Sequence, residues 1–311
     1  MKKILISGAN PAWQKALTFP KITAGKVNRA KEILEFASGK GINFARAVSI
    51  YGKADAEVVQ FLAGANGKRI ALELDREKIA HTDIFLADGE TRVCSTCIDL
   101  STQESTELIE PSPQLSSDDI EKFKQSVSGK IPDCDAFAIC GTMPSGAPQD
   151  IYYELTMEAL NAGKYVLADT IFNLTPILEA SEKSVLLKIN ADELAEYSKM
   201  NSTVEALQML DSKYLLACAA ITDGPNKAYL LFNHKIYEYE LPKLENIVNP
   251  IGCGDTASAV LMSEFMASGD ALKAFSAALG CASANCLSML CASYDLNFAL
   301  DYANKLIIKE I

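Results

Sequence analysis

The 311-residue sequence has only two histidines, His81 and His234, and no run of 18 consecutive apolar residues. Two histidines so far apart in the sequence disfavour a zinc site or a histidine-based catalytic triad. Without a long apolar run there is no candidate transmembrane helix. The opening residues MKKILISGAN pass into turn residues without the apolar core of a signal peptide. We therefore expect a cytoplasmic protein that does not enter a membrane.

The sequence also lacks an excess of positive charge. Lys and Arg total 29 while Asp and Glu total 40, which gives a formal net charge of −11. A general affinity for nucleic acid or for an anionic membrane needs a basic surface. A small molecule is therefore the expected partner, and neither nucleic acid nor a membrane is expected to bind.

The nine cysteines do not indicate a disulfide framework. Their number is odd and the chain has no secretory signal, so we expect free thiols. Cys94 and Cys97 form a lone C-x-x-C inside a strand-like run, where residues three apart point to opposite faces. A shared metal or redox role for these two is not expected.

Short apolar runs of strand type alternate with stretches of helical type. The strand-type runs lie at 3–7, 57–62, 136–140, 165–168, 185–189, 215–222 and 228–232, and the helical stretches include 41–50, 149–162, 192–199 and 204–210. This alternation predicts an α/β fold in which a mainly parallel sheet lies between two layers of helices. From Asp255 to the end, the chain is predicted to be almost entirely helical.

Two regions, at about 11–37 and 88–112, alternate polar with apolar or β-branched residues. That pattern suits antiparallel strands with one solvated face. We interpret them as a small β-sheet, a candidate lid on a single domain spanning 1–311, because no linker, low-complexity tract or repeat divides the chain. Exposed strand edges and apolar side chains on such a sheet are usually covered by a partner, so we expect a homodimer formed through the lids.

The strongest local motif is Asn249-Pro-Ile-Gly-Cys-Gly-Asp-Thr256, followed by an apolar helical run. A Gly-x-Gly turn that opens a helix leaves unpaired backbone N–H groups at the positive end of the helix dipole, which is a site for phosphate. An acidic residue directly after the glycines repels a phosphate but suits a base beside a transferring phosphoryl group. The alternative is that Asp255 is an ordinary helix N-cap.

A second motif, Ser38-Gly39-Lys40-Gly41-Ile42-Asn43, also leads into a helix. Small residues let a ligand approach the backbone, while Lys40 and Asn43 supply a cation and an amide for hydroxyls or phosphate. A plain loop before a helix is the alternative. The Walker spacing does not occur around it, and no G-x-G-x-x-G follows the first strand, so neither a P-loop nor an NAD site is predicted.

Together the two motifs resemble the paired signatures of the PfkB (ribokinase-like) carbohydrate kinases, which usually read GGKGxN and GAGD. Further segments match in order and spacing, closest to the 1-phosphofructokinase and tagatose-6-phosphate kinase branch: Asn10-Pro11-Ala12, Gly25-Lys26-Val27-Asn28-Arg29, Gly89-Glu90-Thr91-Arg92, Cys140 to Gly146, Lys188-Ile189-Asn190-x-x-Glu193 and Thr222-Asp223-Gly224. The resemblance implies a three-layer α/β/α fold with a small β-sheet lid. It also implies MgATP-dependent phosphorylation of a hexose phosphate of the fructose 1-phosphate or tagatose 6-phosphate type.

The resemblance assigns roles to individual residues. It implies that Asp255 is the general base and that the N–H groups of Gly252, Cys253, Gly254 and Asp255 stabilise the γ-phosphoryl group in the transition state. Implied substrate-binding residues are Gln14, Lys26, Arg29, Gly39, Lys40, Asn43, Arg92 and Thr142, of which Lys26, Arg29 and Arg92 would hold the phosphate of the sugar. Implied nucleotide-binding residues are Lys188, Asn190, Glu193, Thr222, Gly224 and Asn285, with Glu193 reaching Mg²⁺ through water.

Departures from the usual motifs leave the identity of the sugar open. Gln14 stands where the family usually has an Asp that binds sugar hydroxyls, and Ser38 replaces the first Gly of the sugar loop. One alternative is a kinase of a non-phosphorylated sugar or a nucleoside, in which Lys26, Arg29 and Arg92 would face solvent. Another is a non-catalytic sugar-phosphate sensor of the same fold.

Overall fold

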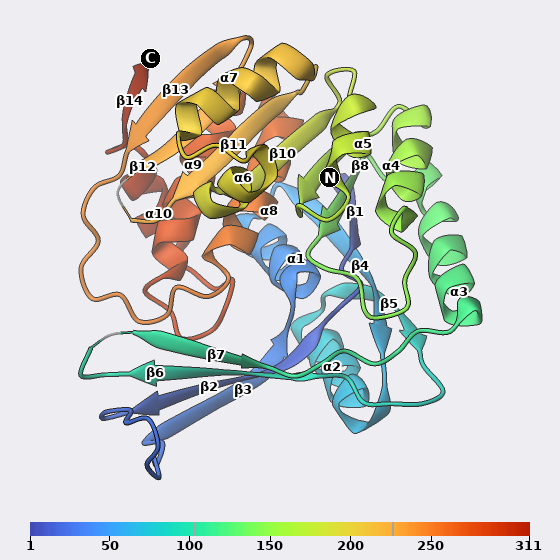
Figure 1. Ribbon diagram of the computed structural model, residues 1–311, viewed down its shortest axis with the longest axis vertical. Helices are drawn as coiled ribbons and strands as arrows, with labels where there is room; N and C mark the ends of the chain where they lie inside the picture. The colour runs from blue at the N-terminus through green and yellow to red at the C-terminus, as the bar shows by residue number, and fades with distance from the viewer. Residues whose placement is uncertain (103, 226) are drawn as a thin grey trace.

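The computed structural model describes residues 1–102, 104–225 and 227–311 (Figure 1). The large sheet has the strand order β14 (Ile307–Glu310), β13 (Lys235–Glu240), β12 (Lys227–Phe232), β11 (Cys218–Asp223), β10 (Val185–Asn190), β9 (Tyr165–Asp169), β8 (Ala136–Cys140), β1 (Lys2–Ser7), β4 (Ala54–Leu62) and β5 (Ala80–Phe85). From β11 to β5 all neighbours are parallel, whereas β12, β13 and β14 are added antiparallel. The mainly parallel sheet predicted from the sequence is confirmed.

Helices cover both faces of this sheet (Figure 1). One face carries α1 (Lys40–Tyr51), α2 (Gly64–Glu77), α8 (Cys253–Ser268), α9 (Ala271–Asn285) and α10 (Leu296–Ala303). The other carries α3 (Ser117–Ser128), α4 (Ile151–Asn161), α5 (Leu174–Glu179), α6 (Ala191–Ser198) and α7 (Thr203–Lys213). Successive strand residues enter opposite cores: Ile4 and Ile6 pack against the first group of helices and Leu5 against the second. This explains why the parallel strands have continuous apolar sequences.

A separate small sheet has the order β3 (Glu32–Ser38), β2 (Ala12–Phe19), β6 (Val93–Asp99) and β7 (Ser105–Ile109). It extends from the lower edge of the molecule in Figure 1. On one face Trp13 is buried as part of the main core, and the Arg69 guanidinium of α2 lies 4.0 Å from the centre of its indole ring. On the other face Ala16 and Phe36 pack against Cys291 of the main body. The smaller sheet of the expected fold is therefore present, but the expectation of antiparallel strands is wrong for its central pair, because β2 and β6 run parallel.

The prediction for the C-terminal part is wrong in one respect. After α10 the chain forms β14, which pairs antiparallel with β13 and has an exposed surface. An edge strand of four residues has no buried face, so it lacks the alternation that identifies a strand in sequence. No helix within the described ranges is long and apolar enough to cross a lipid bilayer.

Candidate active site

A cavity of about 670 Å³ opens at the carboxyl ends of β1, β8 and β9, and it is called the polar cavity here because its lining includes the charged residues Lys40, Arg92 and Glu193. Ligand sites of parallel α/β sheets form at this edge, because the loops that follow the strands converge there. Its lining includes Asn10, Lys40, Arg92, Ile109, Thr142, Phe172 and Glu193. Thr142 Oγ1 accepts a hydrogen bond of 3.3 Å from Asn10 Nδ2. The cavity therefore unites residues from five of the predicted segments.

The first turn of α8 provides a second element of the site. Its N-cap, Gly252, has a φ of 79°, and no side chain caps the helix. A Cβ atom at Gly252 would lie 3.0 Å from the Ala292 nitrogen, so a left-handed backbone and a close approach both require glycine there. Among the described residues no acceptor binds the amides of Gly254 and Asp255. These donors, at the positive end of a 16-residue helix, can bind an anion.

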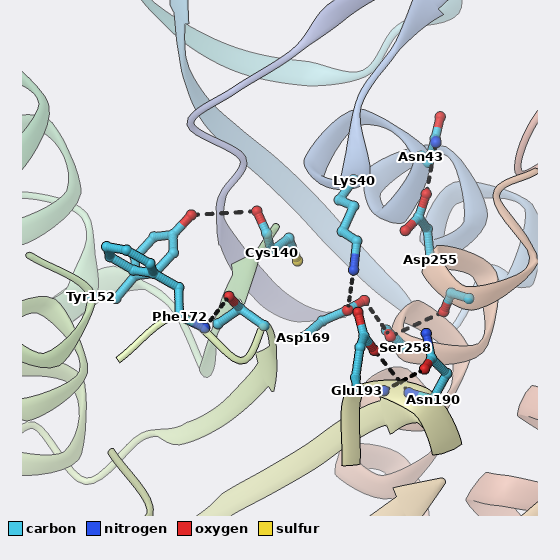
Figure 2. Close-up of polar contacts among 12 residues, drawn as sticks. Lys40, Asn43, Cys140, Tyr152, Asp169, Phe172, Asn190, Glu193, Asp255 and Ser258 are labelled. Atoms are coloured by element: carbon cyan, nitrogen blue, oxygen red, sulfur yellow. Dashed lines mark hydrogen bonds and ion pairs between the residues drawn. The ribbon is translucent and has the colours of Figure 1, made fainter. Parts of the chain in front are cut away.

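Asp255 lies in this first turn, and only 8% of its surface is exposed. Asn43 of α1 donates from Nδ2 to Asp255 Oδ2 over 2.7 Å (Figure 2). The Oδ1 atom of Asn43 accepts from Ser38 Oγ at 3.2 Å and from Arg46 Nη1 at 3.4 Å, which fixes the orientation of the amide. Burial, opposed by Lys40 and reinforced by Asp169, raises the pKa of Asp255 to about 6. A carboxylate with such a pKa can accept a proton near neutral pH.

Asp169, at the end of β9, is the residue that the sequence analysis missed. Its carboxylate accepts from Lys40 Nζ over 2.7 Å and from Ser258 Oγ over 2.7 Å (Figure 2). Burial alone would raise the pKa of Asp169, but Lys40 and Lys188 outweigh it and hold the pKa below its usual value. Asp169 thus connects β9, α1 and α8. The available signal was an acidic residue directly after the apolar run 165–168.

Lys188 and the start of α6 border the same turn of α8. A Cβ atom on Gly254 would lie 3.5 Å from Lys188 Nζ, so the ammonium group is adjacent to the free amides. Lys188 is 3% exposed, and burial lowers its pKa. Asn190 and Glu193 form a capping box: each side chain accepts from the other residue's backbone amide at 2.8 Å. This explains the Asn-x-x-Glu spacing structurally and leaves one Glu193 oxygen uncommitted.

A mainly apolar cavity of about 430 Å³ begins on the other side of the first turn of α8. Its lining includes Thr222, Gly224, Leu244, Ile247, Cys253, Gly254, Leu279, Cys286 and Tyr302. The predicted nucleotide residues Thr222 and Gly224 therefore lie here. The first turn of α8 contributes Cys253 and Gly254 to this cavity, and Lys40, whose charge acts on Asp255 in the same turn, lines the polar one. Such a cavity can take a flat heteroaromatic group while the attached phosphates reach the helix.

Two predicted phosphate ligands are not brought to the site within one chain. Lys26 and Arg29 lie in the exposed connection between β2 and β3 and do not line the polar cavity. At about 3.3 Å per residue, β2 carries the chain roughly 23 Å away from its start near the site. Only Arg92, which follows β5 and precedes β6, reaches the cavity. Lys26 and Arg29 therefore do not contribute to the polar cavity of their own chain, and their role as phosphate ligands stays a prediction.

Three other residues occupy structural positions. Gln14 is buried in the small sheet, where its Nε2 donates to Thr96 Oγ1 over 2.8 Å, because β2 and β6 are neighbours. Asn285 is fully buried; its amide donates to the Ile251 carbonyl over 2.9 Å and therefore supports the loop before α8 instead of lining a cavity. Gly39 is the N-cap of α1 and also lines neither cavity.

Comparisons with known proteins agree with this geometry. The family model described as pfkB family carbohydrate kinase matches residues 10–296. A tagatose-6-phosphate kinase from Staphylococcus epidermidis is 27% identical over 266 residues, which is 84% of each chain. Two crystal structures share the fold: one described as a possible 1-phosphofructokinase from Thermotoga maritima (TM-score 0.88, 19% identity, 99% of both chains) and phosphofructokinase-2 from Escherichia coli with potassium (TM-score 0.85, 18% identity, 98% and 99%).

Proposed function

Because this chain belongs to the pfkB family of carbohydrate kinases and is an ATP-dependent sugar kinase, we propose that it phosphorylates a hydroxyl of a hexose phosphate. The acceptor would be of the fructose 1-phosphate or tagatose 6-phosphate type, and the products a hexose bisphosphate and ADP. Asp255 would take the proton from the attacking hydroxyl. The amides that open α8 would stabilise the charge on the transferring phosphoryl group.

One observation carries this proposal: the buried Asp255 lies in the first turn of α8, directly after Cys253 and Gly254, which line the apolar cavity. Its hydrogen-bond partner Asn43 lies three residues after Lys40, which lines the polar cavity. A sugar in the polar cavity would bring a hydroxyl toward the carboxylate. ATP in the apolar cavity would bring its γ-phosphate to the same turn. The hydrogen bond from Asn43 holds one carboxylate oxygen, so the other is free to accept the proton.

The nucleotide and metal assignments use residues that lie in or beside the two cavities: Thr222 and Gly224 line the apolar one, and Glu193 lines the polar one. We propose that Thr222 and Gly224 contact the nucleotide and that Lys188 binds its phosphates. The described residues contain no group of three or more His, Cys, Asp or Glu side chains that could hold a metal. Mg²⁺ commonly binds through substrate phosphates, waters and only one or two carboxylates, and the uncommitted oxygen of Glu193 suits that role through water. Bound with ATP, Mg²⁺ would neutralise phosphate charge.

Arg92 is the residue that supports a phosphorylated sugar. It lines the polar cavity and donates from Nη2 to the Asn10 carbonyl over 2.9 Å. Its Nε is buried and has no partner among the described residues. A buried donor without an acceptor costs free energy. A phosphate on the sugar would accept a hydrogen bond from this donor and would also pair with the positive charge of the guanidinium group. The exposed positions of Lys26 and Arg29 favour a second candidate, a kinase of a non-phosphorylated sugar.

A substrate panel separates these candidates. ADP release with MgATP is measured with fructose 1-phosphate, fructose 6-phosphate, tagatose 6-phosphate, free hexoses and nucleosides. We expect turnover with one hexose phosphate, and we expect Arg92→Ala to raise the KM for it about 10- to 100-fold, the effect of one or two charged hydrogen bonds. Arg76→Ala, at an exposed position of α2, is the matched control. Turnover only with an unphosphorylated compound, unaffected by Arg92→Ala, would establish the second candidate.

We also propose that the small sheet is a lid and the surface of a homodimer. Arg92 directly precedes β6, Ile109 is the last residue of β7, and both line the polar cavity. The sheet therefore covers the site and can exclude water from it. The sheet region exposes Val27, Ile33, Leu34, Leu100, Leu108 and Ile109. Within the described residues no strand pairs with the outer edges of β3 and β7. Light scattering should give twice the chain mass of 33.6 kDa, and a monomer mass at micromolar concentration would contradict the proposal.

A further inference from the structure

Two cysteine sulfurs meet in the wall of the apolar cavity. Cys253 Sγ and Cys286 Sγ are 3.0 Å apart, and both residues line the cavity. Cys253 is the first residue of α8, and Cys286 directly follows α9. Their side chains come together because α8 and α9 pack against each other in antiparallel directions, a contact that is also visible in Figure 1. Asn285 Nδ2 donates to Cys253 Sγ over 3.0 Å and holds that sulfur in place.

This pair differs from the other cysteines of the chain. All nine are free, and five of them, Cys134, Cys140, Cys218, Cys281 and Cys291, are buried. Cys94 and Cys97 are partly exposed but lie three residues apart on one strand, so they face opposite sides of the small sheet. Within the described residues only Cys253 and Cys286 combine a sulfur partner at contact distance with access from a cavity.

The two thiols also differ in their ionisation. The contact between the two sulfurs lowers the pKa of Cys286, and the same contact, together with burial, raises the pKa of Cys253. The thiolate is the reactive form of cysteine. We therefore assign Cys286 as the sulfur that attacks first. Cys253 then attacks the mixed disulfide that forms on Cys286.

We propose that Cys253 and Cys286 form a reversible disulfide on reaction with a small-molecule disulfide and that the bond lowers the affinity of the apolar cavity for nucleotide. The Cys286 thiolate attacks one sulfur of R–S–S–R, a mixed disulfide forms and one thiolate RS⁻ leaves. Cys253 loses its proton to solvent and attacks the Cys286 sulfur, which releases the second RS⁻. The protein loses two electrons, and the small disulfide gains them as two thiols.

The cross-link acts on the first turn of α8. A disulfide bond is about 2.05 Å long, so the sulfurs must move about 1 Å closer, and the hydrogen bond from Asn285 to Cys253 is disturbed. Cys253 is itself part of the first turn of α8, whose amides would bind the phosphate. Binding sites require their contacting groups to be placed within about 0.5 Å. A nucleotide in the cavity would cover both thiols and slow their oxidation. This consequence rests on the proposed assignment of the cavity to ATP.

The test compares oxidised and reduced protein. The full chain is incubated with oxidised glutathione, remaining thiols are alkylated, and the protein is digested without reductant for peptide mass mapping. We expect a peptide pair that joins Cys253 to Cys286, a lower yield of it in the presence of MgATP, and at least a tenfold weaker binding of a fluorescent ATP analogue, reversed by dithiothreitol. Each variant is compared with itself before and after oxidation. Cys286→Ser should resist oxidation, whereas Cys97→Ser should remain as sensitive as the native chain.

Each part of the proposal can be overturned separately. If no joined peptide appears, or if Cys286→Ser responds to oxidation as the native chain does, the thiol pair is not the reactive site. A joined peptide with unchanged nucleotide binding overturns the link to the cavity. Both readouts are independent of sugar turnover. If no hexose phosphate in the panel is turned over, the proposed function is overturned. The peptide map would still decide whether the disulfide forms.

Discussion

Replacing Asp255 by asparagine is expected to lower kcat by about 10²- to 10⁴-fold, the usual contribution of a general base. Asparagine has the same shape and can still accept the hydrogen bond from Asn43, so the first turn of α8 should keep its geometry. It cannot take up the proton of the attacking hydroxyl. The change also removes a negative charge beside the phosphate position, so the KM for ATP should not rise. Steady-state kinetics with the substrate found in the panel measure both constants.

The pH dependence of kcat/KM is a second test of the role of Asp255 as the base. Because the pKa of Asp255 is raised to about 6, the base is protonated below that pH, and kcat/KM of the native protein should fall about tenfold per pH unit there. The Asp255→Asn variant should lack this acid limb. Asp301→Asn, at an exposed position of α10, is the control and should keep both the rate and the limb. A variant at Asp255 that keeps more than a tenth of the native kcat would contradict the assignment.

The fold was predictable from the sequence because its parallel strands are buried on both faces. Runs such as 136–140 and 185–189 are continuous and apolar, and the structure has β8 and β10 there. β14 lies at the edge of the sheet beside β13, and the partial or full exposure of these two strands removes that signal. Edge strands are positioned by tertiary pairing, which a local pattern does not encode.

The sequence predicted those parts of the candidate site in which a short motif forms the first turn of a helix. Asp255 and Asn43 occupy the first turns of α8 and α1, and the fold brings these turns together although the residues are 212 positions apart. Motif matching does not report distance along a strand, so it grouped Lys26 and Arg29 with Arg92 although, within one chain, only Arg92 of the three lines the polar cavity. It also does not distinguish a side chain that contacts a ligand from one that supports a loop, as Asn285 does.

Asp169 shows what the sequence could not assign. A single Asp after an apolar run is compatible with a turn, a cap or a binding residue. Its role follows only from the two lysines that converge on it, Lys40 from α1 and Lys188 from the neighbouring strand β10. A buried carboxylate between two ammonium groups keeps positive charge at a site for phosphates without leaving that charge uncompensated.

Replacing Asp169 by asparagine is therefore expected to lower the free energy of unfolding by about 3 kcal/mol, as when one partner of a buried ion pair is removed. Asparagine keeps the size and the hydrogen bond from Ser258, so packing and that bond do not account for the loss. Urea unfolding at neutral pH measures it. Ser258→Ala is the matched control: it removes the hydroxyl and leaves the charges, and should cost about 1 kcal/mol. A loss below 1 kcal/mol in Asp169→Asn would show that the carboxylate does not balance the two lysines.

The pH dependence of that loss identifies its cause. Burial already lowers the pKa of Lys188 in the folded chain, and removal of the Asp169 charge should lower it further. The unfolded chain then binds more protons than the folded chain between the lowered pKa and the usual value near 10.5, so the free energy of unfolding rises with pH in that window. The deficit of Asp169→Asn relative to the native chain should therefore be greatest near neutral pH, where Asp169 and Lys188 are both charged, and narrow as the pH approaches 10. A deficit that is constant across this range would point to lost packing instead of uncompensated charge.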